Sequence, residues 1–300
     1  MKTKPSQLKP FRAGYIAIIG KPNVGKSTLM NHLLEEKLAI VSPRPQTTRN
    51  RILGILNGDG YQAIFLDTPG LMEPKYLLQQ SLTKTSMSTM EQADLILFLI
   101  DATNISVEDD KIIDILKTKH ALKFLIINKI DLVKRERILP IIQTFQAYKI
   151  FKEIIPISAL KADGLELLLS LSTASLPESE PFYPADIFTD EPERFFVSEI
   201  IREKIFLFYG EEIPYATAVQ INTFQEKPGE KDYIRAIIHV ERDSQKGILI
   251  GKKGQAIKKV GQTARKDIEQ FLGRPVFLEL DVQVKKKWRK NPVLIKRLGY

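Results

Sequence analysis

The sequence contains no cysteine, one tryptophan and three histidines among its 300 residues. The lack of cysteine excludes a disulfide framework and a thiolate zinc site, and it is typical of proteins from a reducing compartment. The longest clean apolar run covers residues 95–100, which is far too short to span a bilayer, and the first residues lead into no apolar stretch of signal-peptide length. We therefore expect a cytoplasmic protein. The three histidines are scattered along the chain, and we expect them to be structural.

The net charge of +9 is unevenly distributed along the chain. Residues 1–180 carry 23 basic and 19 acidic side chains, and residues 181–241 carry 6 and 12, whereas residues 242–300 carry 16 and 5. A basic segment attached to a nearly neutral protein usually faces the phosphates of a nucleic acid or an anionic membrane. The length of the chain suffices for two domains.

Residues 20–27 read Gly-Lys-Pro-Asn-Val-Gly-Lys-Ser, which is the spacing of a phosphate-binding loop. An apolar, β-branched run precedes this stretch and a helix-forming run follows it, as the motif requires. We expect Lys26 to reach the β- and γ-phosphates and the Ser27 hydroxyl to hold Mg²⁺. The expected nucleotide contacts from this loop are Gly20, Lys21, Pro22, Asn23, Val24, Gly25, Lys26, Ser27 and Thr28.

Two further segments supply candidates for the metal and the γ-phosphate. Residues 37–51 predict a loop, in which we favour Thr48 over Thr47 as a second hydroxyl on Mg²⁺; an ordinary surface loop is the alternative. A hairpin over residues 51–66 ends in Asp67-Thr68-Pro69-Gly70, where Asp67 can bind Mg²⁺ through water and the Gly70 N–H can meet the γ-phosphate. The candidate catalytic residues are Lys26, Thr48 and Gly70, the candidate metal ligands are Ser27, Thr48 and Asp67, and the nucleotide contacts gain Asp67, Thr68, Pro69 and Gly70.

The tetrapeptide Asn128-Lys129-Ile130-Asp131 follows a strand predicted at residues 121–127. The Asp131 carboxylate can accept hydrogen bonds from guanine N1–H and from the N2 amino group, whereas adenine lacks donors at both positions. Asn128 can tie the base to neighbouring loops, and the Lys129 stem can cover the base. GTP and GDP are therefore the expected ligands. The nucleotide contacts predicted here are Asn128, Lys129 and Asp131, with Ser158, Ala159 and Leu160 as a later segment whose backbone N–H groups can meet guanine O6.

The remaining periodicity completes an α/β domain. Residues 71–89 are polar and rich in serine and threonine, which favours a mobile loop with a short helix. Further strands are expected at residues 94–101 and 153–157, and helices at residues 107–119, 135–148 and 165–175.

This order and wording of motifs resembles the Era family of translation-factor-type GTPases, which act in bacterial ribosome assembly. The matching stretches are the phosphate loop, Pro-Gln-Thr-Thr-Arg at residues 45–49, Asp-Thr-Pro-Gly and Asn-Lys-Ile-Asp. The resemblance implies a P-loop GTPase domain with a six-stranded, mostly parallel sheet, helices on both faces and the nucleotide at the strand carboxyl ends. Leu71 stands where Ras-like proteins place a water-orienting glutamine, so it cannot orient the attacking water. Asn23 lies where some related GTPases hold a potassium ion, which makes K⁺ a candidate besides Mg²⁺.

An acidic, proline-rich segment at residues 176–193 predicts a linker between two domains. The order that follows is a helix (194–209), two strands (215–224 and 233–240), a helix, Gly251-Lys252-Lys253-Gly254, a helix to about residue 272 and a strand (276–284). This order resembles an α+β KH domain of type II, as the Era family has, and such domains clamp single-stranded RNA at the Gly-x-x-Gly turn. The expected domains are a GTPase domain (1–175), a linker (176–193) and a KH domain with a basic tail (194–300).

The basic tail leaves two alternatives open. Its lysines can bind RNA phosphates while Trp288 stacks on a base, or the tail is a solvated basic end with Trp288 packed on the domain. The expected RNA contacts are Ile250, Gly251, Lys252, Lys253, Gly254, Lys258, Lys259, Lys285, Lys287 and Trp288.

The sequence thus predicts a monomeric, GTP-hydrolysing switch whose nucleotide state controls a KH domain. The resemblance implies that the RNA is the 3′ end of small-subunit ribosomal RNA and that the partner is the small ribosomal subunit during assembly. Era-like proteins are also reported at membranes, and the basic tail permits peripheral contact with the inner face of the cell membrane. A metabolic phosphotransferase and a static RNA-binding scaffold are the alternatives. The guanine motif argues against the first, and nucleotide-dependent RNA affinity would separate the second from a switch.

Overall fold

The computed structural model describes residues 10–42 and 44–300, so the first nine residues and Pro43, which belongs to the loop expected at residues 37–51, lie outside the described residues. The chain divides into two compact units. The last boundary of this division falls after Asp190, within the segment expected as a linker (176–193), and two short segments of the N-terminal half belong to the second unit. The first unit holds the described residues up to Ala39, Arg51–Met72 and Thr85–Asp190, and the second holds Ile40–Asn50, Glu73–Lys84 and Glu191–Tyr300.

A six-stranded sheet forms the centre of the first unit, in the order β2-β3-β1-β4-β5-β6. Neighbouring strands are parallel except β2 and β3, which form the expected antiparallel hairpin. The central strands are apolar because both faces of the sheet are covered, and β4 is buried along its whole length. The strands are β1 (Arg12–Gly20), β2 (Ile52–Gly58), β3 (Tyr61–Asp67), β4 (Leu95–Asp101), β5 (Leu122–Asn128) and β6 (Glu153–Pro156).

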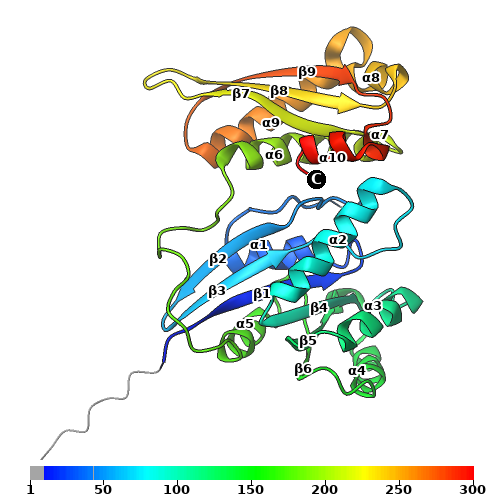
Figure 1. Ribbon diagram of the computed structural model, residues 1–300, viewed down its shortest axis with the longest axis vertical. Helices are drawn as coiled ribbons and strands as arrows, with labels where there is room; N and C mark the ends of the chain where they lie inside the picture. The colour runs from blue at the N-terminus through cyan, green and yellow to red at the C-terminus, as the bar shows by residue number, and fades with distance from the viewer. Residues whose placement is uncertain (1–9, 43) are drawn as a thin grey trace, which may run out of the picture. The chain divides into compact units, whose positions relative to one another are not determined.

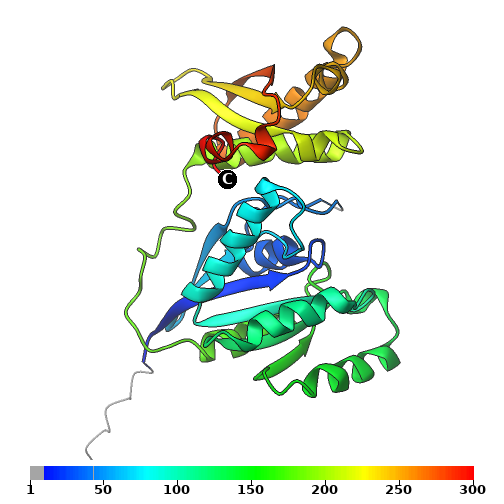
Figure 2. The same cartoon turned by 45° about the vertical axis from the view of Figure 1, so that its right-hand side comes forward.

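Helices cover both faces of this sheet, which confirms the predicted α/β fold (Figure 1; Figure 2). Side chains of α2, α3 and α4 share one apolar cluster with β1, β4 and β5, whereas α1 and α5 pack against β1 and β3. The helices are α1 (Lys26–Leu34), α2 (Leu77–Gln92), α3 (Val107–Lys117), α4 (Ile138–Gln146) and α5 (Leu165–Ala174).

The expectation of a mobile loop with a short helix at residues 71–89 is wrong, because α2 is a regular helix of 16 residues. Its polar residues satisfy their hydroxyls within the fold: Thr89 Oγ1 donates to the Thr85 carbonyl at 2.8 Å, and Ser86 Oγ donates to the Pro69 carbonyl at 2.8 Å. Serine and threonine lower helix propensity only weakly once their hydroxyls are bonded in this way. The polar composition of this segment was therefore a poor guide to its secondary structure.

Most of the segment expected as a linker belongs to the first unit. Gln62 Oε1, in β3, accepts hydrogen bonds from the backbone N–H groups of Phe182 and Tyr183 at 2.7 and 3.0 Å. Farther along, Thr189 Oγ1 donates to the Leu53 carbonyl at 2.7 Å. The prolines prevent regular structure, but the backbone groups are satisfied by the strands that the segment covers.

The second unit contains a three-stranded sheet in the order β7-β8-β9, with β7 and β8 antiparallel and β8 and β9 parallel. The helices α6, α8 and α9 enclose a common apolar core with this sheet. The predicted order helix, strand, strand, helix, helix, strand is present, but two short helices were not predicted: α7, which covers the expected start of the first strand at residue 215, and α10 after β9. The elements are α6 (Glu193–Phe208), α7 (Ile213–Ala216), β7 (Ala218–Gln225), β8 (Asp232–Val240), α8 (Asp243–Ile250), α9 (Gln255–Leu272), β9 (Val276–Val284) and α10 (Pro292–Arg297).

The two short N-terminal segments complete a second apolar cluster of this unit. Leu78 and Leu82, from the first half of α2, pack with Trp288 and with residues of α10. Arg49 is 3% exposed, and its guanidinium donates to the Thr217 carbonyl at 2.6 Å and to the Pro214 carbonyl at 3.0 Å. The same guanidinium lies 5.9 Å from the centre of the Trp288 ring. In the part of the chain that the structure describes, no helix is long and apolar enough to cross a bilayer.

Candidate functional site

The loop between β1 and α1 takes the backbone conformation that its glycines permit. Gly20, Asn23 and Gly25 have φ values of 157°, 63° and 103°. A Cβ at Gly20 would lie 2.4 Å from the Leu99 carbonyl oxygen, and one at Gly25 would lie 2.2 Å from Asn128 Nδ2. Glycine is therefore required at both positions, and the second close approach joins the loop to the tetrapeptide after β5.

Lys26, at the start of α1, is a buried ammonium group. It is 6% exposed, and its Nζ donates to the carbonyls of Gly20 and Lys21 at 3.2 and 2.8 Å. Burial lowers the pKa of Lys26 to about 8, against the opposing effect of the Asp67 carboxylate. A phosphate group at this loop would compensate the buried charge, because it supplies anionic acceptors where carbonyls now serve.

The two candidate metal ligands of the first unit meet at the end of β3. Ser27 Oγ donates to Asp67 Oδ2 at 2.6 Å, and Asp67 is fully buried. The neighbouring Thr68 Oγ1 donates to the Ile18 carbonyl at 2.9 Å, which fixes the strand end against β1. A hydroxyl and a carboxylate are hard oxygen donors, so the pair fits Mg²⁺.

The two threonines proposed for the same cation lie in the second unit. Both Thr47 and Thr48 are 8% exposed, and Thr47 Oγ1 donates to the Arg44 carbonyl at 2.8 Å. The choice between them therefore stays a prediction.

Gly70 packs directly on the phosphate loop. A Cβ at Gly70 would lie 2.6 Å from the Pro22 nitrogen, so only glycine allows this approach. The next residue, Leu71, is 4% exposed, belongs to the apolar core, and donates its backbone N–H to the Gly20 carbonyl at 3.0 Å. A buried leucine cannot orient a water molecule, as predicted from its apolar side chain.

The expected base site comes together from three loops. Asn128 Nδ2 donates to the Val24 carbonyl at 2.7 Å, and Asn128 Oδ1 accepts from the Ala159 N–H at 2.9 Å. Asn128 thus joins two of these loops, while its predicted contact with the base stays a prediction. The exposed Asp131 carboxylate accepts from Ser158 Oγ at 2.6 Å, which places the two guanine-binding candidates together.

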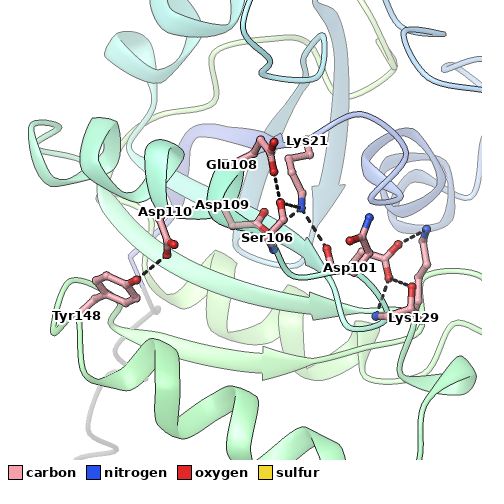
Figure 3. A network of polar contacts seen from close by, with 10 residues as sticks. Lys21, Asp101, Ser106, Glu108, Asp109, Asp110, Lys129 and Tyr148 are labelled. Carbon is pink, nitrogen blue, oxygen red and sulfur yellow. Dashed lines mark hydrogen bonds and ion pairs between the residues drawn. The ribbon is translucent and has the colours of Figure 1, made fainter.

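Two lysines of the expected site pair with carboxylates at the end of β4 and in the first turn of α3 (Figure 3). Lys129 Nζ lies 2.6 Å from Asp101 Oδ2. Burial acts to raise the pKa of Asp101, but hydrogen bonds from Lys129 and Thr103 outweigh it and hold this pKa below its ordinary value. Lys21 Nζ lies 2.7 Å from Asp109 Oδ2. Sequence reasoning missed both carboxylates.

A second candidate site lies at the turn between α8 and α9. Gly251, Lys253 and Gly254 have φ values of 71°, 51° and 76°, and Lys252 and Lys253 are exposed. A Cβ at Gly251 would lie 2.6 Å from Ala256 Cβ, so the glycine allows the tight turn. Lys259, expected to face RNA, places its Nζ 4.7 Å from the centre of the Phe208 ring.

A groove of about 260 Å³ follows this turn between α9 and β9. Of its lining, only Lys258 was predicted. The spacing of Lys258, Gln262 and Arg265 along one helix face is a signal that could have found the others. The groove is lined by Ile257, Lys258, Gly261, Gln262, Arg265, Leu278 and Leu280.

The expected contact between Trp288 of the basic tail and an RNA base is wrong. Trp288 is fully buried, and its Nε1 donates to the Ala216 carbonyl at 2.9 Å, so no face of the ring is open to a base. The packed alternative is thus the one observed. Lys285 is half-buried, with its Nζ 3.3 Å from His239 Nε2, and its pKa is lowered by burial and by the charge of Arg297. Lys287 remains exposed.

These features define a class of protein. A phosphate loop with a buried lysine, a serine and aspartate suited to Mg²⁺, and a predicted base site at Asp131 are the features of a P-loop GTPase, here joined to a KH fold. Family models agree: one described as a 50S ribosome-binding GTPase matches residues 15–129, and one described as a KH domain matches residues 212–289.

Full-length relatives then identify the family. GTPase Era of Geobacter metallireducens is 47% identical over 293 residues, covering 97% of this chain and 98% of the relative. GTPase Era of Lactobacillus helveticus is 44% identical over 292 residues, covering 97% of each chain. A crystal structure of Era with MgGDPNP and nucleotides 1506–1542 of 16S ribosomal RNA superposes with a TM-score of 0.94 at 42% identity, covering 97% of this chain and 99% of that one. The chain belongs to the Era family of GTPases.

Proposed function

We propose that this protein couples the binding and hydrolysis of GTP to the binding of the 3′ end of small-subunit ribosomal RNA during ribosome assembly. The observation that carries the proposal is the shared architecture with an Era that is bound to both MgGDPNP and 16S ribosomal RNA, at a TM-score of 0.94 over 97% of this chain. The retained phosphate loop, guanine motif and Gly-x-x-Gly turn support the same function.

The nucleotide roles follow from the chemistry of the site. Lys26 meets the β- and γ-phosphates, and Ser27 and Asp67 hold Mg²⁺, with Thr48 favoured over Thr47 as the ligand that responds to the γ-phosphate. Mg²⁺ supplies charge neutralisation at the phosphates when it is bound. The Gly70 N–H donates to the γ-phosphate, and Asp131 accepts from guanine.

We propose K⁺ as a further cofactor, held by Asn23. Because the Leu71 side chain is buried, the charge that develops during hydrolysis needs another stabilising group. Asn23 has a left-handed backbone and lies in the phosphate loop with an exposed side chain, so its carboxamide oxygen is a suitable ligand. GTP turnover is then faster in K⁺ than in Na⁺ for the wild type, and Asn23→Ala removes the difference. Equal wild-type rates in both salts would exclude the potassium site.

The RNA interface is proposed at the turn and the groove of the KH domain. Two exposed lysines at the turn attract the phosphate backbone, and the groove offers polar groups to the bases. The charge-reversed variant Lys252→Asp with Lys253→Asp loses RNA affinity and has a smaller salt dependence, by roughly one to two counterions. Its basal GTP hydrolysis stays near normal.

The experiment that tests the function compares variants of the nucleotide site and of the RNA site. RNA crosslinked to the protein in cells is sequenced for the wild type, for Lys26→Ala and for the charge-reversed turn. We expect small-subunit ribosomal RNA from the wild type, a changed yield from Lys26→Ala and a loss with the turn variant. A turn variant that retains wild-type affinity and salt slope for single-stranded ribosomal RNA would move the interface to the tail, where Lys285 and Lys287 lie.

The place of action is proposed to be the cytoplasm, with the protein as a monomer. The basic C-terminal residues would also permit peripheral contact with the inner face of the cell membrane, because several of them are exposed. Binding of the protein to anionic vesicles but not to neutral vesicles, measured without RNA, would show this membrane contact separately from RNA binding.

A further inference from the structure

The side chain of Lys21 points away from the phosphate loop toward the first turn of α3 (Figure 3). Its Nζ donates to the Asn104 carbonyl at 3.1 Å, to Ser106 Oγ at 3.0 Å and to Asp109 Oδ2 at 2.7 Å. An ammonium group has three donors, and all three are used. Lys21 therefore offers no side-chain donor to a phosphate, although it lies next to the first glycine of the loop.

The partner carboxylate depends on this lysine. Asp109 is fully buried, and the Lys21 side chain is 12% exposed, so the pair is screened from solvent. Asp109 Oδ2 also accepts the Ser106 N–H at 2.9 Å, which caps α3. Within the part of the chain that the structure describes, Asp109 Oδ1 is buried without a hydrogen-bond partner. The positive charge of Lys21 therefore compensates the cost of burying the Asp109 carboxylate.

The backbone around Lys21 contacts the two residues proposed to meet the γ-phosphate, Lys26 and Gly70. The Lys21 carbonyl accepts Lys26 Nζ at 2.8 Å. The next residue, Pro22, is the one against which Gly70 packs, since a Cβ at Gly70 would lie 2.6 Å from the Pro22 nitrogen. Fixing Lys21 thus fixes both the lysine that reaches the phosphates and the surface that locates the Gly70 N–H.

We propose that Asp109 and Lys21 are a positioning pair that holds the first half of the phosphate loop in the geometry required for the γ-phosphate. Neither residue's side chain touches the reacting atoms. GDP lacks the group that Gly70 contacts, so the pair sets the preference for GTP over GDP and the rate of hydrolysis more than it sets nucleotide affinity as a whole. This inference rests on the proposed roles of Lys26 and Gly70.

The test compares Lys21→Met, Asp109→Asn, the double variant and the wild type. Asparagine keeps an acceptor for the Ser106 N–H but removes the ion pair. Asp114→Asn is the matched control, because Asp114 lies on the same helix, is exposed, and pairs with the exposed end of Lys117 at 2.8 Å. The measurements are kcat and KM for GTP hydrolysis, the dissociation constants of GDP and of a non-hydrolysable GTP analogue, and the unfolding temperature.

We expect kcat to fall by about tenfold or more in both single variants, because small displacements of catalytic groups carry costs of this size. The affinity for the GTP analogue should fall more than that for GDP, and the double variant should resemble the single variants, because one pair is broken in each. If Asp109→Asn does not fold, Lys21→Met alone carries the test. Wild-type kcat with a wild-type affinity ratio in folded Lys21→Met would overturn the proposal. So would an equal loss for both nucleotides. Activity in the wild type and in Asp114→Asn keeps the GTPase function separate from this result.

Discussion

Lys26 should make the nucleotide-free protein less stable. Its pKa of about 8 lies below the ordinary lysine value of 10.5, so the unfolded chain binds this proton more tightly than the folded protein. The difference corresponds to about 3 kcal/mol of destabilisation while both states are protonated, which is the case below pH 8. As the pH rises from 8 toward 10.5, the folded protein loses the proton first and this cost declines.

The substitution Lys26→Met removes the charge and keeps most of the side-chain volume. It also deprives the Lys21 carbonyl of a donor, at a cost of about 1 kcal/mol, whereas the Gly20 carbonyl retains the Leu71 N–H. We therefore expect a net gain of about 2 kcal/mol at pH 7, or roughly 4–8 °C in the unfolding temperature of the first unit. The variant should lose GTP binding, because no other group replaces the ammonium.

The assay is thermal unfolding of nucleotide-free protein at pH 7 and pH 9.5, with the exposed Lys134→Met as the control substitution. The advantage of Lys26→Met should shrink at pH 9.5, where about 1.4 kcal/mol of the original cost remains. Added Mg²⁺ and GDP should raise the unfolding temperature of the wild type and of Lys134→Met, but not that of Lys26→Met. A variant that is less stable than the wild type at both pH values would refute the reasoning.

Three other predictions concern single side chains. Asp131→Asn should weaken GTP binding and favour xanthosine triphosphate, and unchanged discrimination between GTP and ATP in competition binding would contradict the base site. Burial and the charge of Lys285 lower the pKa of His239 to about 4, so the stability of the second unit should fall as the pH drops from 6.5 to 4, and chemical denaturation of His239→Gln should show a weaker dependence. Trp288→Phe should cost about 2 kcal/mol in the free energy of unfolding while the salt slope of RNA binding stays unchanged; a reduced slope would restore Trp288 to the interface.

The local motifs were predictable because each is contiguous and has a strict geometric reason. Gly20 and Gly25 have positive φ values, which favour glycine. Asp67 stands at the end of a buried strand. The sheet followed from strand-length apolar runs alternating with helices. Such signals lie within ten or so residues and can be read without knowing the tertiary contacts.

The features that the sequence did not indicate depend on long-range partners. Nothing near Trp288 in the sequence indicates that Leu78 and Leu82 pack with it, and nothing near Lys21 indicates Asp109, although Ser106 and Asp109 have the spacing of a helix cap. The segment at residues 176–190 has linker composition, but its backbone groups form hydrogen bonds with the Ile55 N–H of β2 and with the Gln62 side chain of β3. Propensity and composition cannot show which strand a distant irregular segment will cover.

The division of the chain into two interleaved units determines which fragments of this protein are complete. The chain passes five times from one unit to the other, at residues 39, 50, 72, 84 and 190, so a single cleavage does not separate them. A fragment that starts at Glu191 would expose the Trp288 side of its core, because Leu78 and Leu82 are missing. A fragment that ends at Asp190 would keep Arg49 without the carbonyls of Pro214 and Thr217. The C-terminal half is therefore not a self-sufficient module, and a chimera that exchanges it must also transplant residues 40–50 and 73–84.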